Sequence, residues 1–189
     1  MKIGVLACQG DFIEHIKILF QLGVETVEVR LPEDLKGLAG LIIPGGESTT
    51  IGKLAVTYNL MEPLREFSDK KPIWGTCAGM IFLAKEIGMD QPLLGIMDIE
   101  VERNAFGRQV DSFKADLYAP FLDKGDSKPF PAIFIRAPKL IAAKGKAKVI
   151  AKLADRTAVA AREGKWLVTS FHPELTEDNR FHRYFLGLI

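Results

Sequence analysis

The segment Gly75-Thr-Cys77-Ala-Gly79 has the spacing expected around a nucleophilic cysteine. A short apolar run precedes it and a helical pattern follows, so Cys77 would occupy a sharp turn between a strand and a helix. Such a turn strains the backbone, and the flanking glycines let the strand and the helix pass closely. The N–H groups that begin the helix favour a thiolate and can hold an oxyanion. The alternative is a small buried hydrophobe, the commoner state of a free cysteine, but the glycines favour the nucleophile.

His172 and Glu174 have the chemistry of the partners that such a cysteine needs. Residues 166–171 have a strand pattern, so His172 would emerge at the end of a strand, where catalytic groups of open α/β sheets gather. Pro173 stiffens the link, and Glu174 can then orient the imidazole and stabilise its charged form. The alternative is a histidine in a proline-containing turn with Glu174 capping the next helix. Taken with the cysteine motif, a triad is the better interpretation.

The segment Pro44-Gly-Gly-Glu-Ser-Thr-Thr50 follows another predicted strand. Its glycines allow backbone N–H groups to approach a ligand closely, and Ser48 or Thr49 could cap a helix. The segment matches neither common phosphate-binding motif. It is better placed to supply an oxyanion-hole N–H opposite Cys77.

The other cysteine and histidines lack such a context. Cys8 is followed only by Gln9-Gly10, and we interpret it as structural, at the end of the first strand. His15 and His182 lie within amphipathic helical patterns, which predicts side chains that face solvent.

Alternating strand and helix patterns in the first half predict a mostly parallel sheet covered on both faces. The predicted strands are residues 2–8, 26–30, 41–43 and 72–74, and the predicted helices are residues 12–23 after an Asp11 cap, 50–67 with a break near Asn59, and 80–86.

After Gly88 the pattern changes to strands with few helices between them, which predicts an antiparallel extension and a closing strand. The predicted strands are residues 96–103, 112–117, 132–135, 148–153, 158–162 and 166–170. Residues 120–131 should form an exposed loop, and residues 180–188 a terminal helix.

The composition limits the classes of function. The chain has 189 residues, 25 Lys+Arg, 24 Asp+Glu and 48% hydrophobic residues, which predicts one α/β domain that needs no disulfide or structural metal. A net charge of +1 removes the electrostatic argument for a nucleic-acid or anionic-membrane partner. No apolar run is long enough to span a membrane, and the first residues already read as a strand. We therefore expect a soluble, cytoplasmic protein.

The three chemical motifs together resemble those of class I glutamine amidotransferases. Further segments resemble the family of glutaminase subunits of pyridoxal 5′-phosphate synthase, and the likeness runs from Ile3 to at least Glu177. These segments are Pro44-Gly-Gly-Glu-Ser-Thr-Thr50, Val101-Glu-Arg-Asn104, Phe106-Gly-Arg-Gln-Val-Asp-Ser112, Phe134-Ile-Arg-Ala-Pro138 and Ser170-Phe-His-Pro-Glu-Leu175. The chain departs from the family at Cys8, where an aliphatic residue is usual, and in a long, charged loop at residues 120–131.

The resemblance implies a three-layer, flavodoxin-like α/β domain over residues 1–189 that hydrolyses L-glutamine to L-glutamate and ammonia without a cofactor or metal. It implies that Cys77 is the nucleophile, that His172 is the base and then the acid, and that Glu174 orients His172. It also implies an oxyanion hole formed by the N–H groups of Gly46 and Ala78, and a glutamine site formed by Gly46, Glu47, Ser48, Arg103, Ile135 and Arg136. Whether Arg103 or Arg136 holds the substrate carboxylate stays open.

A glutaminase also needs an acceptor for its product. Ammonia released into neutral water is mostly protonated and no longer nucleophilic, and the sequence holds no acceptor site. The resemblance implies a separate TIM-barrel synthase subunit that builds pyridoxal 5′-phosphate. It further implies an assembly of twelve synthase and twelve glutaminase subunits, in which the glutaminase is largely idle until it docks.

Two other classes of function remain as alternatives. A cysteine peptidase or a thiol-dependent deglycase-like hydrolase would use a similar cysteine and histidine. A flavodoxin-like binding or regulatory module would contain an inert, buried Cys77. The 45–48 loop and the Glu174 partner favour the glutaminase.

Overall fold

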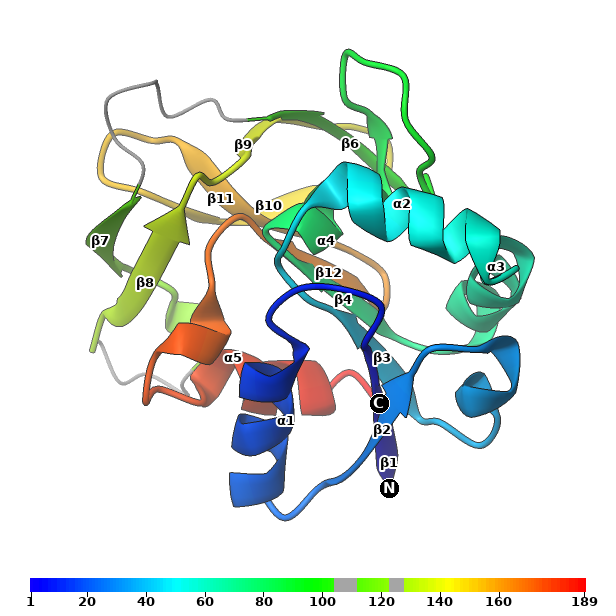
Figure 1. The fold of residues 1–189 in the computed structure, drawn as a ribbon. Helices are drawn as coiled ribbons and strands as arrows, with labels where there is room; N and C mark the ends of the chain where they lie inside the picture. The colour runs from blue at the N-terminus through cyan, green and yellow to red at the C-terminus, as the bar shows by residue number, and fades with distance from the viewer. Residues whose placement is uncertain (104–111, 123–127) are drawn as a thin grey trace.

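The central feature of the computed structural model is a seven-stranded sheet (Figure 1). The structure describes residues 1–103, 112–122 and 128–189. The strand order is β10-β11-β12-β4-β3-β1-β2. The strands are β1 (Lys2–Leu6), β2 (Glu25–Val29), β3 (Gly40–Ile43), β4 (Ile73–Thr76), β10 (Lys148–Lys152), β11 (Ala158–Glu163) and β12 (Trp166–Thr169).

The five strands from β2 to β12 run parallel, and β11 and β10 extend the sheet in antiparallel pairing. The predicted mostly parallel sheet with an antiparallel extension is confirmed. Because β4 and β12 are parallel neighbours, their carboxyl ends lie side by side. Cys77 follows β4, and His172 lies three residues beyond the end of β12, so the topology brings the two motifs to one edge.

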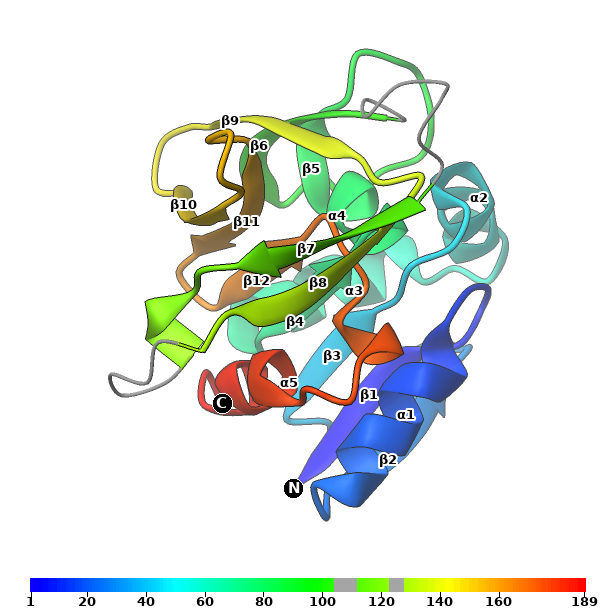
Figure 2. The ribbon, with the colours of Figure 1, turned by 90° about the vertical axis from the view of Figure 1, so that its left-hand side faces the viewer.

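Helices cover both faces of this sheet, as Figures 1 and 2 show. Helices α1 (Phe12–Gln21) and α5 (Arg180–Leu186) pack on one face, and α2 (Ser48–Thr57), α3 (Met61–Lys70) and α4 (Ala78–Leu83) pack on the other. Consecutive side chains of a strand point to opposite faces, so a strand covered on both sides is apolar throughout. In β3, Leu41 and Ile43 enter one core while Ile42 enters the other. The predicted three layers are therefore present.

Two small sheets lie beside the central one. The first contains β5 (Ala84–Glu86), β6 (Met97–Glu102) and β9 (Lys139–Ala143), and the second is the hairpin of β7 (Ser112–Leu117) and β8 (Phe130–Ile135). Short 3₁₀ turns occur at η1 (Pro32–Leu35), η2 (Pro120–Leu122) and η3 (Pro173–Leu175).

Several sequence predictions need correction. The helix predicted over residues 80–86 ends at Leu83, because the next three residues pair with β6, and β9 was not predicted. Asp11 is the first residue before α1, but its side chain makes no capping hydrogen bond. The break near Asn59 is confirmed, since α2 ends at Thr57 and Asn59 has a φ of 54°.

The loop predicted at residues 120–131 is shorter than expected, because both of its described ends belong to regular structure. It begins as η2, and Phe130 already belongs to β8. Residues 123–127, and most of the segment 106–112 that supports the family resemblance, lie outside the described residues.

Candidate active site

Cys77 occupies a strained turn between β4 and α4. Its φ of 47° and ψ of −104° are unusual for a residue with a side chain, as the motif predicted. The glycines on either side are sterically required. A Cβ on Gly79 would lie 2.1 Å from the carbonyl oxygen of Ile43 in β3, and one on Gly75 would lie 2.5 Å from the carbonyl of Gly79. The strand and the helix can therefore cross only because both positions lack side chains.

The structure brings Cys77, His172 and Glu174 together. The backbone N–H of Cys77 donates to the carbonyl of Thr169 in β12 at 2.8 Å, which ties the turn to the strand that leads to His172. The Nδ1 atom of His172 lies 2.7 Å from Oε1 of Glu174, and the Cys77 side chain hydrogen-bonds to the same imidazole. All three side chains are buried. The Cys77 Sγ atom also faces the carbonyl oxygen of Ile135 at 3.9 Å.

The electrostatics of the imidazole follow from these contacts. Burial alone would lower the pKa of His172, but its hydrogen bonds to Cys77 and Glu174 outweigh burial and raise that pKa to about 10. Burial raises the pKa of Glu174, although the neighbouring imidazole works in the opposite direction. The arrangement therefore favours a protonated His172, with Glu174 as the counter-charge.

Asp11 adds a second carboxylate near the imidazole, with Oδ2 3.5 Å from His172 Nδ1. The ligand-type atoms of Asp11, His172 and Glu174 lie within 4.8 Å of one another, which is close enough for a metal ion. However, the short His172–Glu174 hydrogen bond already uses Nδ1. We therefore interpret the group as a hydrogen-bonded triad with an adjacent carboxylate.

The loop after β3 lies against the imidazole. A Cβ on Gly45 would come within 2.3 Å of Cε1 of His172, and the Gly45 carbonyl accepts a hydrogen bond from the Asp11 N–H at 3.1 Å. Gly46 has a φ of 150°, and a Cβ there would lie 2.4 Å from Oε1 of Gln9. Gln9 also accepts the N–H of Glu47 at 2.8 Å. Sequence reasoning missed the roles of Gly45 and Gln9, because each depends on contacts between distant segments.

Glu47 caps the N-terminus of helix α2. Its carboxylate accepts hydrogen bonds from the N–H groups of Thr49 at 3.1 Å and Thr50 at 2.6 Å. Partial burial disfavours the charged carboxylate. These two hydrogen bonds, together with a third from the hydroxyl of Thr50, outweigh that effect and lower the pKa of Glu47 to about 2. The predicted Ser48 or Thr49 cap is therefore wrong, because the longer Glu47 side chain reaches the same N–H groups.

The two candidate arginines differ in their surroundings. Arg103 donates to Thr49 Oγ1 at 3.0 Å and to Gln91 Oε1 at 2.9 Å, and it pairs with Glu47 at 3.1 Å. Arg136 is exposed, has a φ of 42° and makes no hydrogen bond or ion pair with the described residues. It directly follows Ile135, whose carbonyl faces the thiol. Of the two, Arg136 has the side chain that is available to a ligand.

The remaining predicted residues line the same region. The hydroxyl of Ser48 is buried and hydrogen-bonds with the Gln91 side chain. Ala78 begins α4, where a helix leaves its N–H groups without intrahelical acceptors, and Gly46 lies one residue before the Glu47 cap of α2.

His15 and His182 contradict their prediction. Both are completely buried rather than solvent-facing. His15 Nδ1 lies 2.9 Å from His182 Nε2, and both rings contact Trp74 edge to face. The helical pattern correctly identified amphipathic helices but could not show which polar residues lie on the buried face. Cys8 is half-buried and packs against the core, in keeping with a structural residue.

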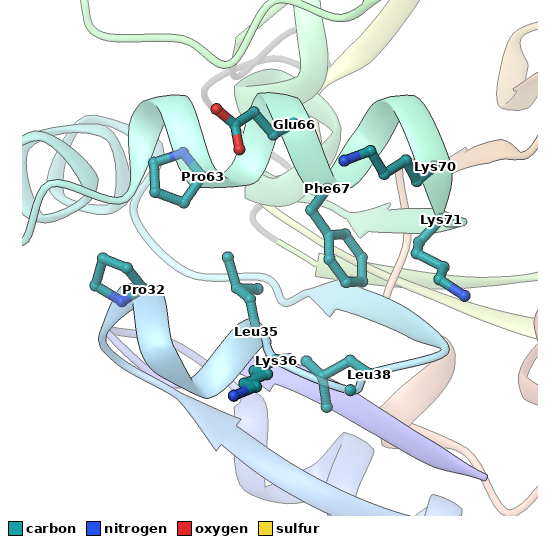
Figure 3. Close-up of a pocket in the computed structure, with 10 residues that line it drawn as sticks. Pro32, Leu35, Lys36, Leu38, Pro63, Glu66, Phe67, Lys70 and Lys71 are labelled. Carbon is teal, nitrogen blue, oxygen red and sulfur yellow. The ribbon is translucent and has the colours of Figure 1, made fainter.

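A groove of about 430 Å³ lies elsewhere, between η1 and α3 (Figure 3). Its walls include Leu38, which precedes β3, and Lys71, which precedes β4. Cys77 and Gly46 follow these strands, so the groove lies at the opposite ends of β3 and β4. It contains none of the predicted site residues and is not the predicted glutamine site. No helix in the described part of the chain has the length and hydropathy of a membrane span.

Comparisons with known proteins agree with the geometry. The model of the SNO glutamine amidotransferase family matches residues 5–189. The pyridoxal 5′-phosphate synthase subunit PdxT of Herpetosiphon aurantiacus is 56% identical over 193 residues, which covers all of both chains. That of Dehalococcoides mccartyi strain 195 is 58% identical over 192 residues, covering all of this chain and 97% of the relative.

Solved structures give the same result. A glutamine amidotransferase structure is 52% identical, with a TM-score of 0.92, and the match covers 98% of this chain and 97% of the other. A putative GMP synthase component from Thermoplasma acidophilum is 21% identical, with a TM-score of 0.69 and coverage of 100% and 93%, so it supports the fold alone.

Proposed function

Because this chain belongs to the SNO glutamine amidotransferase family and is the glutaminase subunit of a pyridoxal 5′-phosphate synthase, we propose that Cys77, His172 and Glu174 carry out its reaction within a single domain of residues 1–189. The observation that carries this proposal is the convergence of the three side chains in one buried cluster. The rest of the reaction follows from their chemistry.

The reaction begins when Cys77 sulfur attacks the side-chain amide carbon of glutamine. His172 holds the proton lost by the thiol, and it donates that proton to the departing nitrogen as the carbon–nitrogen bond of the tetrahedral intermediate breaks. Ammonia leaves, and a thioester joins Cys77 to the glutamyl group. His172 then takes a proton from water, which attacks the thioester and releases glutamate. Glu174 holds the imidazole in one orientation and balances its charge throughout.

The tetrahedral intermediate carries a negative oxygen that needs hydrogen-bond donors. We assign this role to the backbone N–H groups of Gly46 and Ala78. The strained turn supports the assignment, because it aims the start of α4 at the sulfur. Gly46 approaches from the facing loop, where its missing side chain leaves room beside Gln9.

The substrate's amino-acid end needs a cation for its carboxylate. We assign Arg136 to this carboxylate, because Arg103 is already bound to Glu47, Thr49 and Gln91. Arg103 then shapes the site indirectly by holding the start of α2. The Ile135 backbone and the 46–48 loop, including Ser48, would form the remaining walls of the glutamine site.

The product must reach a synthase subunit, since the relatives are named as synthase subunits and free ammonia is protonated in neutral water. We propose that this partner is a TIM-barrel protein, that twelve copies of each protein assemble in the cytoplasm, and that docking activates the glutaminase. The face bearing Cys77 is the natural docking surface, because ammonia is released there.

The deciding experiment measures glutamate and ammonia formed from glutamine by the wild-type chain and by Cys77→Ala, each with and without the synthase subunit. We expect turnover that depends on the synthase and that disappears in Cys77→Ala, with an unchanged melting temperature. Cys8→Ala is the matched control and should keep wild-type activity. Activity in Cys77→Ala, or cleavage of peptides in preference to glutamine, would refute the proposal.

A further inference from the structure

Two buried histidines lie directly behind the triad, on the side of Glu174 that faces away from His172. His15 comes from α1 and His182 from α5, the two helices on one face of the sheet (Figure 2). The Nε2 atom of His15 lies 3.4 Å from Oε2 of Glu174, and its Nδ1 atom lies 2.9 Å from Nε2 of His182. Among the described residues, Oε2 of Glu174 accepts no hydrogen bond of good geometry. His15 is therefore the group closest to satisfying it.

The protonation of these groups follows from burial. Burial lowers the pKa of His182 to about 3, and burial together with the nearby imidazoles lowers the pKa of His15 well below its usual value. Both rings are therefore neutral, and each has one N–H and one lone pair. A buried carboxylate is costly unless its oxygens accept hydrogen bonds.

Only one of the two tautomers of His15 suits this environment. A proton on Nε2 has good hydrogen-bond geometry toward Thr76 Oγ1 at 3.3 Å, and it also lies beside Glu174 Oε2, which is 3.4 Å from Nε2. The Nδ1 lone pair then accepts the Nε2–H of His182, and only a lone pair on His182 Nδ1 lacks a partner among the described residues. The opposite tautomer would place a lone pair beside the carboxylate and leave a buried N–H of His182 unpaired. We therefore assign the Nε2–H tautomer to both rings.

We propose that His15 is a positioning residue for glutamine hydrolysis, whose Nε2–H lies beside the second oxygen of Glu174 and stabilises its charge while His182 fixes the tautomer of His15. The inference rests on the proposed function, because it extends the triad by two residues. The carboxylate then has a ring N–H close to each oxygen, with His172 Nδ1 2.7 Å from Oε1 and His15 Nε2 3.4 Å from Oε2. His15 thereby keeps Glu174 ionised and correctly oriented for His172.

The groups around Glu174 make His15 the available second donor. His172 already contacts the other oxygen of Glu174, Oε1. Asp11, just before α1, is a second carboxylate, and its negative charge disfavours the charge on Glu174. Thr76 at the end of β4 faces His15 rather than Glu174. Without the His15 donor, protonated Glu174 would be favoured, and the pH below which activity is lost would rise.

The kinetic test compares His15→Phe with His15→Gln in the complex with the synthase subunit. Phe keeps the ring volume without a donor, whereas Gln restores an N–H near the carboxylate. We expect His15→Phe to lower kcat about tenfold or more, the size of one hydrogen bond to a charged group, with KM for glutamine nearly unchanged. The acid limb of the pH profile should move upward by about one pH unit. His15→Gln should recover most of kcat and the original acid limb.

A second measurement needs no substitution. The ¹⁵N NMR spectrum of the histidine-labelled wild-type chain reports the tautomer of each ring, and we expect neutral Nε2–H forms for His15 and His182. An Nδ1–H tautomer for His15 would overturn the inference, even if the substituted proteins fail to fold. So would equal losses of kcat in both variants without any shift of the acid limb, since a purely structural role predicts that result. The same assay tests the proposed function separately, because that function requires glutamine hydrolysis by the wild-type chain that Cys77→Ala abolishes.

Discussion

Gly45→Ala tests whether the loop after β3 sets the position of the catalytic imidazole. Gly45 has no positive φ, so alanine is compatible with its backbone and the change is mainly steric. The new Cβ would lie 2.3 Å from His172 Cε1 and 2.9 Å from Nδ1, whereas ordinary contact begins at 3.4 Å. The ring or the loop must therefore move by about 1.1 Å.

The imidazole cannot make that movement without a loss of geometry. Its Nδ1 is held by Glu174 at 2.7 Å, and its backbone N–H donates to the carbonyl of Ile133 in β8 at 2.8 Å. A misplacement of about 1 Å in a catalytic group costs about 100-fold in rate, or about 2.7 kcal/mol in activation free energy. The extra methyl group should also lower the melting temperature by a few degrees, because overpacking destabilises a close-packed interior.

The assay is steady-state glutamine hydrolysis with the synthase subunit present, together with a thermal melt of each protein. We expect Gly45→Ala to lower kcat about 100-fold with a smaller change in KM. Gly187→Ala is the matched control, because Gly187 also has no positive φ and the nearest atom to its new Cβ would be the carbonyl oxygen of Tyr184 at 3.3 Å, not a triad residue. A folded Gly45→Ala protein with kcat within about threefold of wild type would refute the reasoning, since the catalytic geometry would then not depend on this contact.

Three further predictions concern charge and substrate binding. Because the pKa of His172 is raised to about 10 from 6.5, its imidazolium should persist at high pH, and kcat/KM should fall only as the pH approaches 10; a fall centred near 6.5 would contradict this. Arg136→Ala should raise KM for glutamine by about tenfold or more with little loss of stability, whereas Arg103→Ala should mainly lower the melting temperature; equal effects on KM would contradict the assignment. Glu47→Ala should cost about 1 kcal/mol in unfolding free energy by removing the cap of α2, and Glu47→Asp, which keeps a carboxylate, should cost less in the same denaturant titration.

The cysteine motif was readable from the sequence because its geometry is local. Gly75 and Gly79 are only four residues apart, and the crossing of one strand and one helix requires both of them to lack a side chain. The alternation of strands and helices was readable for a similar reason, since each buried strand carries its own apolar pattern. The break between α2 and α3 near Asn59 could be predicted as well.

Other features depended on which segments became neighbours. The residues of β5 have a helical sequence pattern, yet they pair with β6, and that pairing outweighs local preference. The contact of Gly45 with His172 joins loops that are far apart in the sequence, so nothing local indicates it. The cap of α2 is a milder case, since Ser48 and Glu47 are both capable of that role and the backbone decides between them.

His15 and His182 show most clearly which features the sequence determines and which the tertiary structure decides. The sequence determined that α1 and α5 are amphipathic, and it placed a reactive cysteine, a histidine and a glutamate at the ends of predicted strands. Only the tertiary structure decided that α1 and α5 lie together on one face, which buries His15 and His182 behind Glu174. A periodic pattern describes one element at a time, whereas burial and hydrogen bonding are properties of pairs of elements, so the environment of the triad is decided by packing.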